Sequence, residues 1–267
     1  MSTSSQPAVE RIEQYLPGHW YWADLQTTDL DAATAFYTAI FGWETMDAPG
    51  GHGVYRLCSR DGMAMGALTP CEPGSDMPPQ WFNYVTVTDV DATTARVAEL
   101  GGTVIRQPFD AMDAGRMSVV ADPTGAAFAL WQAINHPGVA SQRTHGAPCW
   151  AELHTSDIAA ARTFYEGLLG YDIQGFEMGP TMTYYVASAG GSQACGMMQH
   201  MDDTSDDSNR WDVYFAVDDV DATHATALTL GATEVFGPHD IPDVGRSSIL
   251  RDPQGALLHL MRGIPSS

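Results

Sequence analysis

The feature that most constrains the fold of this chain is an internal repeat. Residues 22–44 align with residues 150–172 without a gap, and 10 of the 23 positions are identical. Residues 81–133 align in the same way with residues 211–263, with 23 of 53 positions identical. Repeats this dense, in the same order, indicate two homologous domains. We expect an N-terminal tail over 1–16, domains over 17–133 and 148–263, and between them a proline- and glycine-containing polar linker over 134–147.

Each domain also repeats itself more faintly. The stretch DLDAATAFYTAIFG at 29–42 aligns with 89–102, and DIAAARTFYEGLLG at 157–170 aligns with 219–232. An alternating, strand-like segment precedes an aspartate in the N-cap position, and a helical apolar pattern then runs to a glycine. About three short strand-like segments follow, with a DPxG turn before the last. The sequence therefore predicts an α+β protein of four βαβββ units.

Composition excludes several classes of partner. Twelve basic residues face 33 acidic ones, for a formal charge of −21, which disfavours nucleic acid and anionic membrane surfaces. No apolar run is long enough for a membrane span. The four cysteines form no C-x-x-C pair and indicate free thiols. We expect a cytoplasmic monomer or homodimer whose partner is a small molecule.

The repeated unit resembles the vicinal oxygen chelate superfamily, which includes glyoxalase I, bleomycin-resistance proteins and extradiol dioxygenases. The FY-containing helices at 29–42 and 157–170 carry the resemblance, together with the GR…DPxG ends at 115–125 and 245–255. It covers nearly all of residues 20–263. The resemblance implies two tandem glyoxalase/bleomycin-resistance-like domains, each a curved mixed sheet around a cavity.

Members that catalyse reactions usually hold a divalent metal, and the resemblance identifies the ligand positions in this chain. The first-strand positions hold Trp22, Phe82, Trp150 and Asp212, the positions after DPxG hold Ala129 and His259, and the third-strand positions fall near Gly66 and Gly196. Only Asp212 and His259 are metal-ligand candidates. Since an indole offers no lone pair to a metal, we expect no cofactor, with a divalent metal in the second domain as the alternative. At roughly 3.3 Å per residue along the strand, Glu152 could reach that pair, whereas His154 should lie too far away.

The same positions predict aromatic-walled cavities. Trp22, Phe82 and Trp150 should point inward and suit a flat or apolar guest. Four tyrosines on strand-like segments are further candidates for the lining, namely Tyr55, Tyr84, Tyr185 and Tyr214. Ordinary core packing is the competing interpretation for them.

Polar candidates follow the tryptophans. Asp24 and Glu152 are repeat-equivalent carboxylates, each two residues after its tryptophan, and an apolar neighbour would raise the pKa of either as a general base. His154, at the position equivalent to Gln26, could shuttle protons with Glu152. All three could instead serve structure through hydrogen bonds. Arg116 and Arg246 follow glycines and could clamp a substrate carboxylate or hold the DPxG turn.

Three functions remain open from the sequence. The first is a bleomycin-resistance-like protein that binds a small aromatic or carbonyl-containing molecule, either without reaction or with a metal-free transformation of it. The second is a metal-dependent glyoxalase- or dioxygenase-like enzyme with its site in the second domain. The third is a non-catalytic interaction module with filled cavities.

Overall fold

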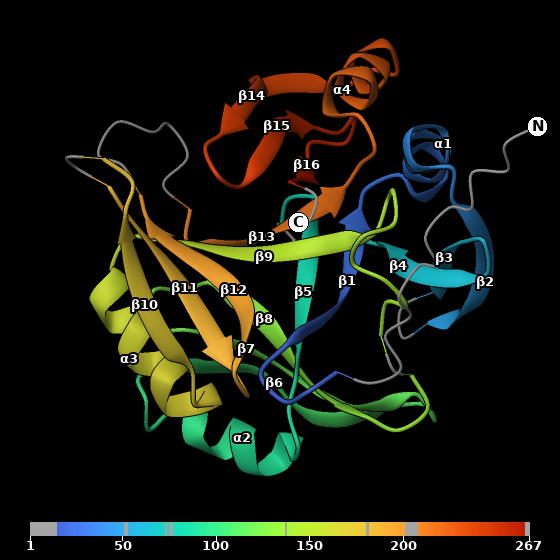
Figure 1. Cartoon of the computed structure of the whole chain (residues 1–267). Helices are drawn as coiled ribbons and strands as arrows, with labels where there is room; N and C mark the ends of the chain where they lie inside the picture. Colours follow the sequence, from blue (N-terminus) through green and yellow to red (C-terminus); the bar gives the residue numbers. More distant parts are fainter. Residues whose placement is uncertain are drawn as a thin grey trace, which may run out of the picture.

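The computed structural model describes residues 15–264 except 51–52, 73, 75–76, 137, 180–181 and 201–207. Most of the predicted N-terminal tail therefore lies outside the described residues, but Tyr15 at its end is buried. The chain forms two eight-stranded mixed sheets, each with two helices, as the four predicted βαβββ units require (Figure 1). None of the helices in the described part of the chain is long and apolar enough to cross a membrane.

The first sheet has the strand order β2-β3-β4-β1-β5-β8-β7-β6. Its elements are β1 (Trp20–Thr27), α1 (Leu30–Phe41), β2 (Glu44–Gly50), β3 (Gly53–Arg60), β4 (Met63–Pro70), β5 (Gln80–Thr86), α2 (Val90–Val97), β6 (Thr103–Ala111), β7 (Gly115–Ala121) and β8 (Ala127–Ala133).

The second sheet repeats this order as β10-β11-β12-β9-β13-β16-β15-β14. Its elements are β9 (Pro148–Thr155), α3 (Ile158–Leu169), β10 (Asp172–Glu177), β11 (Thr183–Ala189), β12 (Ser192–Gln199), β13 (Arg210–Ala216), α4 (Val220–Thr229), β14 (Thr233–Ile241), β15 (Gly245–Arg251) and β16 (Leu257–Gly263).

The helices begin and end at the capping residues that the sequence predicts. The Asp29 and Asp157 side chains accept hydrogen bonds from the third backbone N–H after them, as N-cap residues do. Gly42 and Gly170 end α1 and α3 in the left-handed conformation, with φ of 67° and 70°. These four residues set the length of the helix in the first unit of each domain.

The two domains share their hydrophobic cores. One core joins Val85 and Phe128 of the first domain to Leu153 and Phe164 of the second. The other joins the first unit to the fourth, and accordingly α1 lies beside α4 and α2 beside α3 (Figure 1). The sheets therefore turn their helix-bearing faces toward each other.

The tyrosine of each FY motif ties this interface together. Tyr37 donates a hydrogen bond to Asp252 (2.9 Å) and Tyr165 donates one to Asp122 (3.2 Å), so each reaches the DPxG turn of the other domain. The sequence revealed the motif but not this contact, because its partner lies in the other repeat.

Strand register places the candidate residues at the centre of each curved sheet. Opposite one another are Asp24 and Phe82 on β1 and β5, and Glu152 and Asp212 on β9 and β13. Parallel pairing then sets Tyr214 beside His259 on β16. Side chains from three central strands therefore meet on one face of the second sheet.

Candidate functional site

Both domains build one hydrogen-bonded motif on their inner face. In the first, Trp22 Nε1 donates to the Tyr55 hydroxyl (2.8 Å), and the hydroxyls of Tyr55 and Tyr84 donate to Asp24 (3.2 and 2.6 Å). The indoles at the metal-ligand positions are thus hydrogen-bond donors within a polar motif as well as cavity walls.

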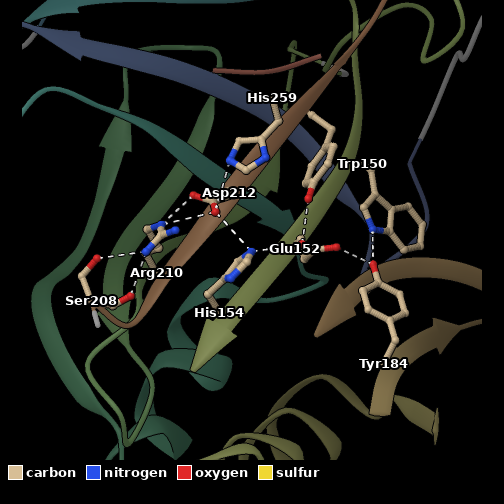
Figure 2. Close-up of polar contacts among 9 residues, drawn as sticks. Trp150, Glu152, His154, Tyr184, Ser208, Arg210, Asp212 and His259 are labelled. Atoms are coloured by element: carbon tan, nitrogen blue, oxygen red, sulfur yellow. Dashed lines mark hydrogen bonds and ion pairs between the residues drawn. The ribbon is translucent and has the colours of Figure 1, made fainter. Parts of the chain in front are cut away.

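The second domain repeats the motif with a glutamate. Trp150 Nε1 donates to the Tyr184 hydroxyl (2.9 Å), and Tyr184 and Tyr214 donate to Glu152 (2.6 and 2.8 Å; Figure 2). Of the two interpretations of Tyr185, core packing holds and cavity lining does not, since that side chain packs against the core between the domains. A shift of one residue along a strand moves a side chain to the other face, and the sequence did not specify which of the two adjacent tyrosines points inward.

Four further ionisable side chains form a chain of contacts that begins at Glu152. His154 Nε2 lies 3.0 Å from Glu152 Oε1 and 3.3 Å from Asp212 Oδ2 (Figure 2). Arg210 Nε donates to Asp212 (3.0 Å), and His259 Nε2 lies 3.3 Å from the same carboxylate. We call Glu152, His154, Arg210, Asp212 and His259 the ionic cluster.

The expectation that His154 lies too far from Asp212 is wrong. The expectation counted residues along β9 from Trp150, as if Trp150 lay opposite Asp212. The residue opposite Asp212 on β13 is instead Glu152. His154 therefore lies only two residues along β9 from the residue opposite Asp212, and its side chain contacts Asp212. Reasoning from sequence also missed Arg210, which pairs with His154 across the strands; the available signal was the change from QWF to RWD between the repeats.

The side chains of the ionic cluster shift one another's pKa values. Burial raises the pKa of Glu152, but the hydrogen bond and charge of His154 and the two tyrosine hydroxyls outweigh it, so the pKa lies below its ordinary value. Burial lowers the pKa of His154, but Glu152 and Asp212 outweigh that effect and raise it. Burial would raise the pKa of Asp212, but His259, His154 and Arg210 together outweigh that effect and lower it. The centre therefore combines carboxylates whose pKa values are lowered with an imidazole whose pKa is raised.

The first domain has no such cluster. Gln26, Phe82 and Ala129 occupy the positions of His154, Asp212 and His259. Burial raises the pKa of Asp24 to about 6, only partly opposed by the hydrogen bonds from Tyr84 and Tyr55. Asp24 Oδ1 has no hydrogen-bond partner among the described residues.

Apolar side chains surround Asp24 on the inner face of the first domain. Trp22, Phe82 and Tyr84 belong to a buried apolar cluster that includes Tyr15 and Val139, from the segments before and after the domain. The Tyr15 hydroxyl donates to the Val139 carbonyl (3.2 Å). Trp22 is 4% exposed, whereas its equivalent Trp150 is only partly buried.

The donors of the ionic cluster do not fit a resident divalent metal. Asp212 is held by the Arg210 guanidinium, whose positive charge opposes a metal ion there, and Trp150 adds no lone pair. The remaining donors contact one another, and within the described part of the chain no group of three or more His, Cys, Asp or Glu residues is arranged to hold an ion.

The two predicted clamp arginines lie in surface ion pairs. Arg116 bonds Asp91 and Asp110, and Arg246 bonds Asp221 and Asp240, with the same geometry in both domains. Neither bonds to the aspartate of a DPxG turn. A role in substrate binding would require these pairs to open.

Comparison with known proteins agrees with this architecture. Residues 19–130 match the family described as the glyoxalase/bleomycin resistance protein/dioxygenase superfamily, and residues 150–261 match the glyoxalase-like domain. The fold and the sequence together define a tandem glyoxalase-type protein. The chain belongs to the glyoxalase/bleomycin resistance protein/dioxygenase superfamily.

Two similar relatives span nearly the whole chain. A putative glyoxylase, CFP32, from Mycobacterium tuberculosis is 43% identical over 261 residues, covering 96% of this chain and 99% of the relative. The anthracycline biosynthesis protein DnrV from Streptomyces peucetius is 37% identical over 273 residues, covering 96% and 98%.

Solved structures share the fold at low sequence identity. The Mn(II)-bound glyoxalase from Novosphingobium aromaticivorans superposes with a TM-score of 0.65 at 16% identity, covering 92% of this chain and 82% of that one. The 2,3-dioxygenase LapB from Pseudomonas sp. KL28 gives 0.63 at 17% identity, covering 93% and 94%.

Proposed function

We propose that this protein binds a small aromatic or carbonyl-containing molecule at the ionic cluster of the second domain, and transforms it by proton transfer without a metal. The observation that carries the proposal is the contact of His154 with both Glu152 and Asp212, beside the partly buried rings of Trp150 and Tyr184. The rings would hold a flat guest and the cluster would bind its oxygen.

The charges support a specific division of roles. The His154 imidazolium would donate a hydrogen bond, and then its proton, to a carbonyl oxygen of the guest. Loss of that proton removes the charge that keeps the pKa of Glu152 low, so the carboxylate becomes more basic and can take a proton from the carbon next to the carbonyl. Asp212 and Arg210 would orient His154. The reverse transfers return both protons, so no oxidant is required.

The relatives are consistent with this proposal. One is named as a putative glyoxylase and another as an anthracycline biosynthesis protein, and both match nearly the full chain. A cytoplasmic location, a monomer or homodimer, and the domain boundaries 17–133 and 148–263 remain predictions.

The test is solvent deuterium exchange into 2-hydroxyacetophenone, an aromatic hydroxyketone, followed by NMR with chelator-treated protein. We expect exchange by the native protein to exceed buffer, and Glu152→Gln to reduce it by about 10²–10⁴-fold. Asp24→Asn is the matched control, because it changes the equivalent carboxylate in the closed domain. Equal exchange by the native protein and Glu152→Gln would exclude the proposed base.

Two further outcomes separate the alternatives. Quenching of tryptophan fluorescence by the ketone without any exchange would leave a binding protein. About one equivalent of metal in untagged protein, with activity lost on chelation, would instead favour the metal-dependent enzyme and contradict the donor arrangement described above.

A further inference from the structure

A cavity of about 380 Å³ lies between the two domains, where the starts of β1 and β9 meet. In Figure 1, β9 runs across the centre of the molecule and its end lies close to β1. Two of its lining residues, Ala23 and Ala151, are repeat-equivalent and too small to fill the space between the sheets. None of the ionic-cluster side chains lines this cavity, but Trp150, whose indole donates to Tyr184 beside that cluster, is one of its walls.

One lining residue breaks the symmetry of this interface. Asn83 is the equivalent of Val213, and both line the cavity. Asn83 is 3% exposed, and its Nδ2 has no hydrogen-bond partner among the described residues. A buried amide donor without a partner costs free energy, and valine would avoid that cost at the same place. The asparagine is therefore a donor available to a molecule in the cavity.

The charge of the lining is unusual for this chain. The protein carries 33 acidic residues against 12 basic ones, yet among the described residues neither an aspartate nor a glutamate lines the cavity. Arg143 does line it and is exposed, and none of the described residues accepts a hydrogen bond from its guanidinium. Gln142 and Gln193 add neutral amides. This lining favours an anion, in contrast to the rest of the surface.

The tryptophans in the cavity walls favour an aromatic ligand. Trp20, Trp22 and Trp150 all line the cavity, and flat apolar rings stack well on indoles. We propose that the interdomain cavity binds a small aromatic carboxylate that carries a second polar group on its ring. Arg143 pairs with the carboxylate at the surface, Asn83 Nδ2 donates to the ring substituent inside, and the indoles contact the ring. The proposal does not depend on the function proposed for the second domain.

The test is isothermal titration calorimetry with 4-hydroxybenzoate, with 4-hydroxybenzamide as the uncharged analogue. We expect saturable binding of the carboxylate, at least tenfold weaker binding of the amide, and tenfold or greater loss of carboxylate affinity in both Asn83→Val and Arg143→Gln. Asn83→Val copies the second domain, and its fold is checked by circular dichroism. Arg143→Gln changes an exposed residue and keeps the test decisive if Asn83→Val does not fold.

Two controls locate the site. Arg262→Gln removes an exposed arginine elsewhere and should leave affinity unchanged. Arg246→Gln removes the surface ion pairs with Asp221 and Asp240 and should also leave affinity unchanged. No binding by the native protein at concentrations on the order of 10 mM, or equal binding by native protein, Asn83→Val and Arg143→Gln, would overturn the proposal.

Discussion

The inner faces of the two domains share a tryptophan–tyrosine–carboxylate–tyrosine motif but place it in opposite environments. In the first domain, Tyr15 and Val139 help to close an apolar cluster over Asp24. In the second, Glu152 joins a network of ionisable side chains that extends to Arg210 and His259. The same backbone motif thus supports a sealed core in one copy and a separated set of charges in the other.

This comparison shows where the capacity for chemistry arises. The carboxylate alone does not supply it, since both domains have one. The differences lie in the residues around it, where glutamine, phenylalanine and alanine in one domain correspond to histidine, aspartate and histidine in the other. Proton transfer needs an acid and a base within hydrogen-bond reach, and of the two inner faces only the second places an imidazole against carboxylates.

The largest expected effect compares the paired positions 212 and 82. Asp212→Asn removes the charge that holds Arg210 and two imidazoles, and should lower the free energy of unfolding by about 3–5 kcal/mol. Phe82→Leu at the equivalent position keeps an apolar side chain of similar size and should cost less than about 1.5 kcal/mol. Urea denaturation measures both. Similar small losses for the two variants would show that the ionic cluster does not stabilise the second domain.

The next effect tests the carboxylate of the closed domain. A folded-state pKa of about 6 for Asp24 lies above its unfolded value of 3.8, so the folded protein binds more protons and loses stability as the pH rises through this interval. Asp24→Asn should raise the unfolding free energy by about 3 kcal/mol at pH 8, and the gain should fade as the pH falls from 6 to 4.

Glu152→Gln is the matched variant in the second domain, and it should change the unfolding free energy in the opposite direction. The pKa of Glu152 is lowered, so its carboxylate stabilises the fold above its ordinary pKa and this variant should lose stability at pH 8. If both variants shift stability in the same direction, the two environments do not differ as described.

A smaller effect concerns His154. Its pKa is raised in the folded state, so its contribution is fully present below pH 6.5 and is lost as the pH rises through the folded value. His154→Gln, which copies Gln26 of the first domain, should cost about 1.5–3 kcal/mol at pH 6 and little in alkaline solution. Denaturation at a series of pH values measures this; a cost that does not vary with pH would mean that the histidine acts only by packing.

The smallest effect is expected from the surface arginines. Arg116→Gln and Arg246→Gln remove exposed ion pairs of the same geometry from the two domains, and we expect no measurable change in stability, ketone binding or deuterium exchange. Loss of ketone binding in either variant would restore the role of substrate clamp that the sequence suggested.

Much of the fold could be predicted from the chain alone. The repeat, the N-cap aspartates and the terminal glycines act within a few residues of sequence, and Asp29 and Gly42 bound α1 as predicted. Strand periodicity also placed Glu152 on the inner face with Trp150. The site was harder to predict, because Arg210 and the position of His154 depend on which residues of β9 and β13 lie opposite one another.

The sequence by itself determined that two homologous domains would form, each built from two βαβββ units, because repeats, caps and periodicity are local properties of the chain. Only the tertiary structure decided which domain was sealed, which of two adjacent tyrosines met Glu152, and how Asp212 came to lie between two histidines. It also decided that Tyr37 and Tyr165 would cross between domains and that Asn83 would face a cavity. These outcomes depend on strand register and on the packing of one repeat against the other, which involve residues more than a hundred positions apart.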